Sequence, residues 1–229
     1  MIGLTLSSIQ DSVIRLMDEH GGNAQFMNGS DNDEIRSIIS QVTEDSFRKI
    51  HLQAPTAMLD GLFTTLPLAT EMIEVNGRYA ARVLPPLDFL RLVRVKMESW
   101  AYPITQLWWE DSSEYAKQKN KYLMGTYERP VGFFVHHLTT TWMELYSSPD
   151  LQDTMSEFIY VQQPKLSDTY YNVSSKLKDA CLMQAAADTL TILGETERSQ
   201  AMQRMADRIL VTYGGNERHY ADNGNRIEK

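Results

Sequence analysis

The stretch Glu71–Met97, EMIEVNGRYAARVLPPLDFLRLVRVKM, decides the fold. Two short apolar runs, Met72–Val75 and Tyr79–Leu84, flank the dipeptide Asn76-Gly77. Asn-Gly best tolerates the two positive-φ positions of a type I′ turn, so this pattern predicts a β-hairpin. Pro85-Pro86 cannot lie inside a ladder of strands, and the next strand is therefore expected to begin after them.

That next strand is expected from Leu90 to Met97. Side chains alternate between the two faces of a strand, which would place Val93 beside Arg91 on one face and Leu92 beside Arg94 on the other. Neither face is purely apolar. We therefore predict an amphipathic strand, and not a central one.

Short segments separated by turn residues continue from residue 56 to residue 166 and predict β structure. Asp111 and Glu114 have the spacing of a capping box, which predicts a short exposed helix over 114–121. The further strands that we expect are 62–66, 102–105, 131–136, 140–146 and 158–161. About six or seven short strands with one interrupting helix predict a small antiparallel sandwich or barrel.

Apolar residues at helical spacing predict helices at both ends of the chain. The expected helices are 6–20, 32–54, 171–193 and 196–210. The last two are joined at Gly194 by so short a link that they must be antiparallel neighbours. None of these helices can bury its apolar stripe alone, so they are expected to pack against each other.

The sequence therefore predicts an α+β fold in which a helical bundle is built from both chain ends. The predicted domains are a bundle over 1–55 and 167–213, and an inserted antiparallel β-sandwich or barrel over 56–166. Residues 214–229, GGNERHYADNGNRIEK, are polar and contain almost no apolar side chains. We expect them to form an extended C-terminal tail that is flexible without a partner.

Composition excludes several functional classes. The 229 residues carry 22 Lys and Arg against 30 Asp and Glu, a net charge of −8, which disfavours wrapping around nucleic acid. No stretch approaches the about 18 apolar residues of a membrane helix, and the start MIGLTLSSIQDSV lacks the features of a signal peptide. The one cysteine excludes an internal disulfide and a four-cysteine zinc site.

No catalytic, cofactor-binding or metal-binding residue is predicted. The chain contains no GxSxG, HExxH, GxxxxGK[ST] or GxGxxG motif. His136 and His137 are adjacent on a predicted strand, so they point to opposite faces and are unsuited to joint metal ligation. His20 and His51 are expected near helix C-termini, where a positive charge is favourable. Cys181 is expected to be an inert small hydrophobic residue within a helix.

Trp108 and Trp109 are possible interface anchors, because tryptophan is enriched at contact hot spots. Adjacent residues of an extended segment face opposite sides, so we expect one of the pair in the core and the other at an interface. Nearby carboxylates, such as Glu110 and Asp111, leave a second hypothesis open. In that hypothesis the chain is a virion module that binds or cleaves glycans.

The order and texture of several segments resemble those of a known protein family. These segments are LPPLDFLRLVRVKMESW (84–100), YPITQLWWEDSSEYAKQKNKY (102–122), ERPVGFFVHH (128–137), TWMELYSS (141–148), FIYVQQP (158–164) and ILGETERSQAMQRMADRIL (192–210). Over residues 30–213 the chain is similar to ring or adaptor proteins of the head-to-tail connector of tailed, podovirus-like phages, and most of all to those of crAss-like phages.

This resemblance implies a structural virion protein, assembled in the host cytoplasm, that forms a dodecameric homo-oligomeric ring beneath the portal. DNA would pass through its lumen during ejection without sequence-specific binding, and further tail or ring proteins would bind to it. Residues 214–229 correspond in position and polarity to a tail that contacts the portal or a neighbour. The expected contact residues are Tyr220 and Ile227 as anchors, with Arg218, His219 and Arg226.

Overall fold

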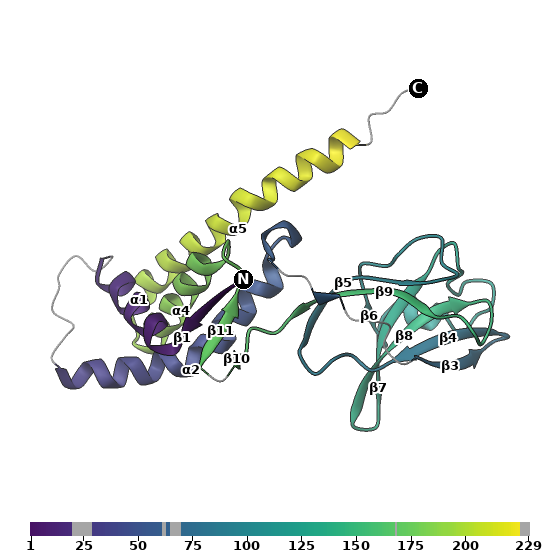
Figure 1. Cartoon of the computed structure of the whole chain (residues 1–229), viewed down its shortest axis with the longest axis horizontal. Helices are drawn as coiled ribbons and strands as arrows, with labels where there is room; N and C mark the ends of the chain where they lie inside the picture. Colours follow the sequence, from purple (N-terminus) through teal and green to yellow (C-terminus); the bar gives the residue numbers. More distant parts are fainter. Residues whose placement is uncertain (20–28, 61–62, 65–69, 168, 225–229) are drawn as a thin grey trace. The chain divides into compact units, whose positions relative to one another are not determined.

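The computed structural model describes residues 1–19, 29–60, 63–64, 70–167 and 169–224 (Figure 1). The chain forms two compact units, a helical unit of residues 1–61 with 163–229 and a β unit of residues 62–162. Both ends of the chain therefore build the helical unit, and the β unit is an insertion between them. This confirms the predicted α+β fold class.

The helical unit consists mainly of helices. They are α1 (Leu6–Glu19), α2 (Gly29–Gln53), the 3-10 helix η1 (Thr56–Met58), α4 (Lys178–Ile192) and α5 (Thr196–Gly224). Helix α4 packs against α1, α2 and α5, and its buried Ala180, Ala185 and Ala186 allow this close approach. Ile39, Phe47 and other apolar residues of the surrounding helices complete the core. Gly194, at φ 82°, ends α4, and α5 follows at once.

A small antiparallel sheet in this unit was not predicted. Its strands, in the order β1-β11-β10, are β1 (Ile2–Thr5), β11 (Tyr170–Val173) and β10 (Leu166–Ser167). The prediction of a helix from residue 171 is therefore wrong for its first turns, since α4 begins at Lys178. Tyr171 and Val173 are buried at strand spacing, and Tyr171 pairs with Leu4 from the distant N-terminal strand.

Helix α5 is longer than the sequence predicts. Gly214-Gly215 was expected to start an extended tail, yet the backbone stays helical to Gly224. Each glycine inside a helix costs roughly 1 kcal/mol relative to alanine, which weakens a helix without forbidding it. Residues 225–229 lie outside the described residues.

The β unit is a sandwich, which is one of the two architectures that the sequence predicts. One sheet has the order β2-β9-β5, and the other has the order β3-β4-β8-β7-β6. The elements are β2 (Phe63–Thr64), β3 (Thr70–Val75), β4 (Arg78–Val83), β5 (Phe89–Met97), β6 (Trp108–Trp109), α3 (Ser113–Lys117), β7 (Val131–His137), β8 (Thr140–Ser148) and β9 (Met155–Gln162). Met143 and Leu145 from one sheet pack with Phe158 and Val95 from the other, which forms the core between the sheets.

The predicted Asn-Gly hairpin is confirmed. Asn76 and Gly77 have φ values of 54° and 77°, and Val75 pairs with Arg78 across the turn. The strand after the two prolines, β5, also forms. Its predicted faces are wrong, because Leu92 and Val95 both pack in the core although they are three residues apart. Irregular pairing of β5 with β9 shifts the alternation at intervals, and bulges of this kind have that effect.

Two other predictions hold only in part. The expected strand 102–105 is reduced to an isolated bridge between Ile104 and Val95. The expected helix 114–121 is the shorter α3, whose N-cap Ser112 accepts a hydrogen bond from the Tyr115 backbone. Only part of the expected strand 62–66, namely β2, lies within the described residues.

A second apolar layer covers the other face of the five-stranded sheet. Phe133 and Tyr146 pack there with Tyr115 from α3. Within this layer, the buried Glu144 carboxylate accepts hydrogen bonds from Arg82 at 2.8 Å and from the hydroxyl of Tyr146 at 2.9 Å. Desolvation, followed by the negative charge of Glu144, raises the pKa of Tyr146 above its ordinary value. This polar network holds neighbouring strands in register.

Candidate interaction surfaces

Trp108 and Trp109 lie at an edge of the five-stranded sheet. They form β6, which pairs in parallel with β7, and they are 41% and 50% exposed. The expectation that one of the two lies in the core is therefore wrong. A strand of two residues at a sheet edge has a neighbouring strand on one side alone, so it leaves both indole rings partly in solvent.

Trp109 is the centre of a polar and aromatic cluster. Its ring stacks on His136 with centroids 5.4 Å apart and an interplanar angle of 17°, and it contacts Phe134 at 5.0 Å. The Glu110 carboxylate lies 3.1 Å from Nδ1 of His136. We call this cluster the tryptophan edge: Trp108, Trp109, Glu110, Phe134 and His136. A flat aromatic surface beside a carboxylate suits a ligand with one apolar and one hydrogen-bonding face.

An aromatic row fixes the tryptophan edge to the core of the β unit. Phe134 contacts Phe89 at 6.0 Å, and Phe89 stacks on Tyr160 at 5.8 Å. The Tyr160 hydroxyl donates to the Asp88 carboxylate at 3.0 Å. Burial, together with that carboxylate, raises the pKa of Tyr160 to about 12. The exposed ring of Trp109 therefore rests on a packed support.

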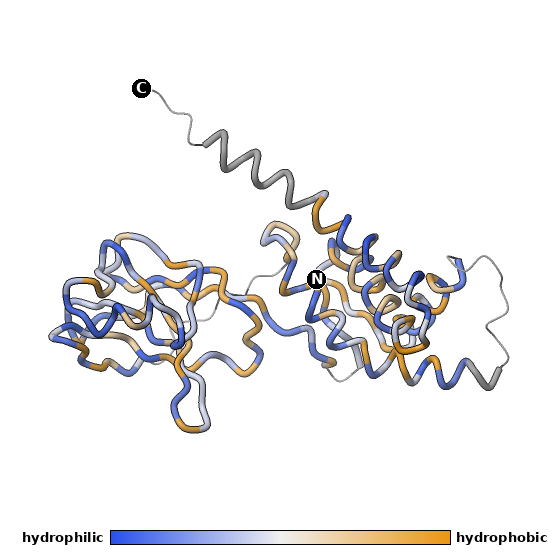
Figure 2. Tube along the Cα trace, turned by 180° about the vertical axis from the view of Figure 1, so that it is seen from behind, coloured by the Kyte–Doolittle hydropathy of each residue, from blue (hydrophilic) through white to orange (hydrophobic). Residues whose placement is uncertain are grey.

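The tip of the β7–β8 hairpin carries an exposed apolar side chain. Leu138 and Thr139 connect the strands, and His137 pairs with Thr140 below them. Leu138 is 94% exposed and has a φ of 58°. The hairpin extends away from the rest of the β unit in Figure 1, and its end is hydrophobic in Figure 2. We call Leu138 and Thr139 the hairpin tip.

The helical unit has an open apolar hollow between α4 and α5. We call it the α4–α5 groove, and its lining residues are Met183, Met205, Arg208, Ile209 and Thr212. It encloses about 360 Å³. Met183, Met205 and Ile209 pack on the helical core with one side and are half-buried, so they present apolar surface at the bottom of the groove.

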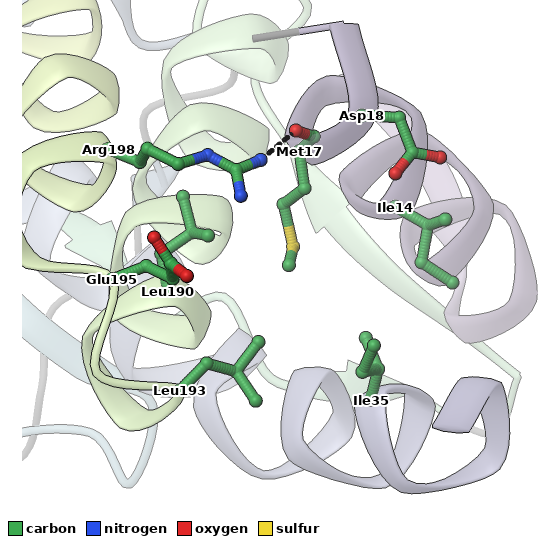
Figure 3. Close-up of a pocket in the computed structure, with 8 residues that line it drawn as sticks. All are labelled: Ile14, Met17, Asp18, Ile35, Leu190, Leu193, Glu195 and Arg198. Atoms are coloured by element: carbon green, nitrogen blue, oxygen red, sulfur yellow. Dashed lines mark hydrogen bonds between the residues drawn. The ribbon is translucent and has the colours of Figure 1, made fainter. Parts of the chain in front are cut away.

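A second hollow in the helical unit is too small for a ligand. Arg198 on α5 reaches across it and donates a hydrogen bond to the Met17 carbonyl of α1 (Figure 3). The residues around it are Ile14, Met17, Asp18, Ile35, Leu190, Leu193, Glu195 and Arg198. The free space inside is about 10 Å³, which is about enough for one water molecule.

Cys181 and His51 meet in the helical core, but their geometry is not that of a catalytic pair. The Cys181 Sγ and His51 Nδ1 atoms are 4.0 Å apart, and both residues are buried. Nδ1 lies 2.8 Å from the Phe47 carbonyl, which can only accept, so this nitrogen donates there. Burial also raises the pKa of the Cys181 thiol well above its ordinary value. The thiol is therefore unreactive, as its position within a helix predicts.

Leu138 and the α4–α5 groove were not predicted from the sequence. The available signal was the run HHLTTT, in which two predicted strands meet without Gly, Asn or Asp in the turn. The predicted tail residues are only partly placed. Arg218, His219 and Tyr220 lie on the backbone of α5, their side chains fall outside the described residues, and Arg226 and Ile227 fall outside them entirely.

In comparisons with known proteins, no family model matches the chain and no curated protein matches it by sequence. In the part of the chain that the structure describes, no group of three or more His, Cys, Asp or Glu side chains is placed to hold a metal ion. Among the same residues, no helix combines the length and the apolar character that crossing a membrane requires.

Proposed function

We propose that the chain is a structural virion protein, a subunit of a ring in the head-to-tail connector of a tailed phage. The ring would join the portal to the tail and extend the DNA channel. The observation that carries the proposal is the layout of the fold. Both chain ends build one helical unit, and a β-sandwich is inserted between them, which is the layout on which the resemblance to connector ring proteins rests.

Exposed apolar side chains on the β unit support an assembly role. Several lie in its loops and turns, including Leu87 at 98% and Leu138 at 94% exposure. Tyr122 and Tyr102 are also exposed. Single exposed apolar residues are ordinary on any protein, but large apolar side chains at protruding positions are what contact hot spots use.

The end of α5 supports a contact with a neighbouring protein. Among the side chains that the structure describes, Leu210 is the last buried one on this helix, and the helical backbone continues to Gly224. In the proposed connector, residues 214–229 contact the portal, and Arg218, His219, Tyr220, Arg226 and Ile227 make that contact. The segment continues the helical backbone to Gly224, and this length suits reaching another subunit.

The charge of the chain suits a channel through which DNA moves. A net charge of −8 gives a repulsive interaction with phosphates, and it opposes adhesion of the duplex to the ring wall. Sequence-specific contacts to DNA form no part of the proposal. The acidic character is a supporting observation, and the layout of the fold carries more weight.

Electron microscopy and mass photometry of the purified chain, alone and with the portal protein of the same phage, test the proposal. We expect closed rings, dodecameric as in the resembling family, that bind the portal. Deleting residues 214–229 should leave the midpoint of thermal unfolding nearly unchanged and weaken portal binding. A chain that stays monomeric and does not bind the portal would contradict the proposed function.

The tryptophan edge favours a second candidate function, a virion module that binds glycans. Trp109 offers an exposed ring with Glu110 beside it, and sugar rings stack on such surfaces. Binding to a glycan array that is lost in Trp109→Ala and kept in Tyr102→Ala would support it. Tyr102 is an exposed aromatic residue outside the tryptophan edge, so it serves as a control.

A further inference from the structure

The hairpin tip contains a residue that the fold itself does not favour. In a two-residue hairpin turn, a first position with positive φ is usually occupied by glycine, asparagine or aspartate. Leu138 occupies that position with a φ of 58°, and its side chain is 94% exposed. A leucine there strains the backbone and buries almost nothing in the monomer. An apolar side chain held in this way is suited to a contact outside its own chain.

The α4–α5 groove offers apolar surface that such a side chain can contact. It is an open hollow of about 360 Å³ whose bottom is formed by Met183, Met205 and Ile209. Methionine side chains are flexible and polarizable, so they adapt to an inserted apolar residue. An open hollow of this size has room for a leucine side chain.

Charged side chains that can pair lie beside the two features, although the exposed Asp179, one turn before Met183 on α4, adds a negative charge at the groove. At the groove, Arg204 and Arg208 are exposed and form no ion pair with any described residue. Asp207 precedes Ile209 by two residues, which places it on the other side of the helix. Near the hairpin, Glu110 bonds to His136, two residues before Leu138, and the exposed Asp111 follows Glu110.

We propose that the hairpin tip of one copy inserts into the α4–α5 groove of a second copy. Leu138 packs against Met183, Met205 and Ile209 of the second copy, and the guanidinium group of its Arg208 pairs with Glu110 or Asp111 of the first. The two surfaces are different, so the contact is head-to-tail, and such contacts propagate into rings or filaments. That these contacts close into a ring, and do not continue into a filament, rests on the proposed connector function.

One such contact is weak by itself. A single hairpin turn buries less than the roughly 1,200 Å² of surface that specific stable interfaces bury. Closure of a ring gives every subunit two contacts, and the last contact forms within the assembly. Assembly is therefore expected to depend steeply on protein concentration, and loss of one hot-spot side chain should shift its midpoint by about 30-fold.

Mass photometry of single variants tests the contact. Leu138→Asn removes the apolar side chain, and asparagine tolerates positive φ. We expect this change to raise the protein concentration at the assembly midpoint by about 30-fold. Leu151→Asn is the matched control, because Leu151 is 58% exposed and lies in the turn between β8 and β9, and it should assemble normally. Normal assembly of Leu138→Asn would overturn the proposal.

Mixing two variants tests the head-to-tail arrangement. Met205→Lys places a long charged side chain at the groove. If the Met205→Lys protein does not fold, Arg208→Glu, at an exposed position, serves as the groove variant instead. Each variant alone should remain monomeric. A mixture of Leu138→Asn with the groove variant restores one intact tip and one intact groove. Because one contact is weak, we expect heterodimers and no larger species by analytical ultracentrifugation at concentrations well above the assembly midpoint of the unaltered chain. Homodimers of either variant, or full rings in the mixture, would overturn the proposal.

The same experiments separate failure of this contact from failure of the proposed function. Rings of the unaltered chain that persist in Leu138→Asn mean that another surface joins the subunits, and the connector function then stands. An unaltered chain that remains monomeric with and without the portal rejects both proposals.

Discussion

The helical unit and the β unit differ in where they leave apolar side chains. In the helical unit, small residues of α4 draw the other helices close, and exposed apolar side chains such as Ile192 and Val211 lie on the helices themselves. In the β unit, two packed layers coexist with exposed apolar residues such as Leu87, Tyr122 and Leu138. This difference teaches that a well-packed core and an apolar surface can occur in the same unit. Contacts with other molecules would explain why these apolar residues are exposed.

The largest expected effects come from emptying one core at a time. Phe158→Ala in the β unit and Phe47→Ala in the helical unit should each lower the free energy of unfolding of their own unit by about 3–5 kcal/mol. Since each unit has its own core, far-UV circular dichroism should show the helical signal surviving in Phe158→Ala. If each variant instead lost the helical signal and the β signal together in one transition, the two units would not unfold independently.

Breaking the buried ion pair of the β unit is the next largest effect. Glu144→Gln leaves the half-buried guanidinium group of Arg82 without its charged partner, and we expect a loss of about 2–3 kcal/mol in urea unfolding. The control is Glu157→Gln, which removes the more exposed pair with Arg94 and should cost about 0–1 kcal/mol. Equal losses in the two variants would contradict the role given to burial.

A change of opposite sign is expected at the hairpin tip. Leu138→Gly should raise the free energy of unfolding of the β unit by up to about 1 kcal/mol, because glycine adopts positive φ without strain. The matched variant Gly77→Ala places a Cβ at a φ of 77° and should destabilise by about 1 kcal/mol. Denaturant midpoints check both variants. Destabilisation by Leu138→Gly would mean that the leucine serves the fold of the monomer.

The smallest expected effect is a pH dependence in the helical unit. Hydrogen bonds from Ser175 hold the pKa of the Asp60 carboxyl below its usual range. A depressed pKa adds stability at pH values above the unfolded pKa of about 3.9, and this stability is lost as the pH falls through the lower folded value. Asp60→Asn should flatten that part of the stability curve between pH 5 and pH 2. An unchanged curve in Asp60→Asn would assign the acid sensitivity to other carboxyls.

Local signals predicted much of the fold. The Asn76-Gly77 turn forms as expected, because the preference for positive φ belongs to those two residues. The faces of β5 were not predictable in the same way, because its bulges depend on the pairing with β9. Tyr171 likewise became part of a strand because Leu4, far away in the sequence, pairs with it.

The candidate surfaces were less predictable than the fold. Trp108 and Trp109 were recognisable by residue type, but the position of β6 at a sheet edge decides that both are exposed. Leu138 looks like an ordinary apolar residue in the sequence, and only its backbone angle and exposure distinguish it.

The sequence by itself determined that helices at both ends enclose a β insertion, since periodicity and turn residues act over short distances along the chain. The tertiary structure alone decided which strands become neighbours, where the alternation of side chains shifts, and which apolar groups remain in solvent. Those outcomes depend on contacts between residues that are far apart in the chain, and no local pattern carries that information.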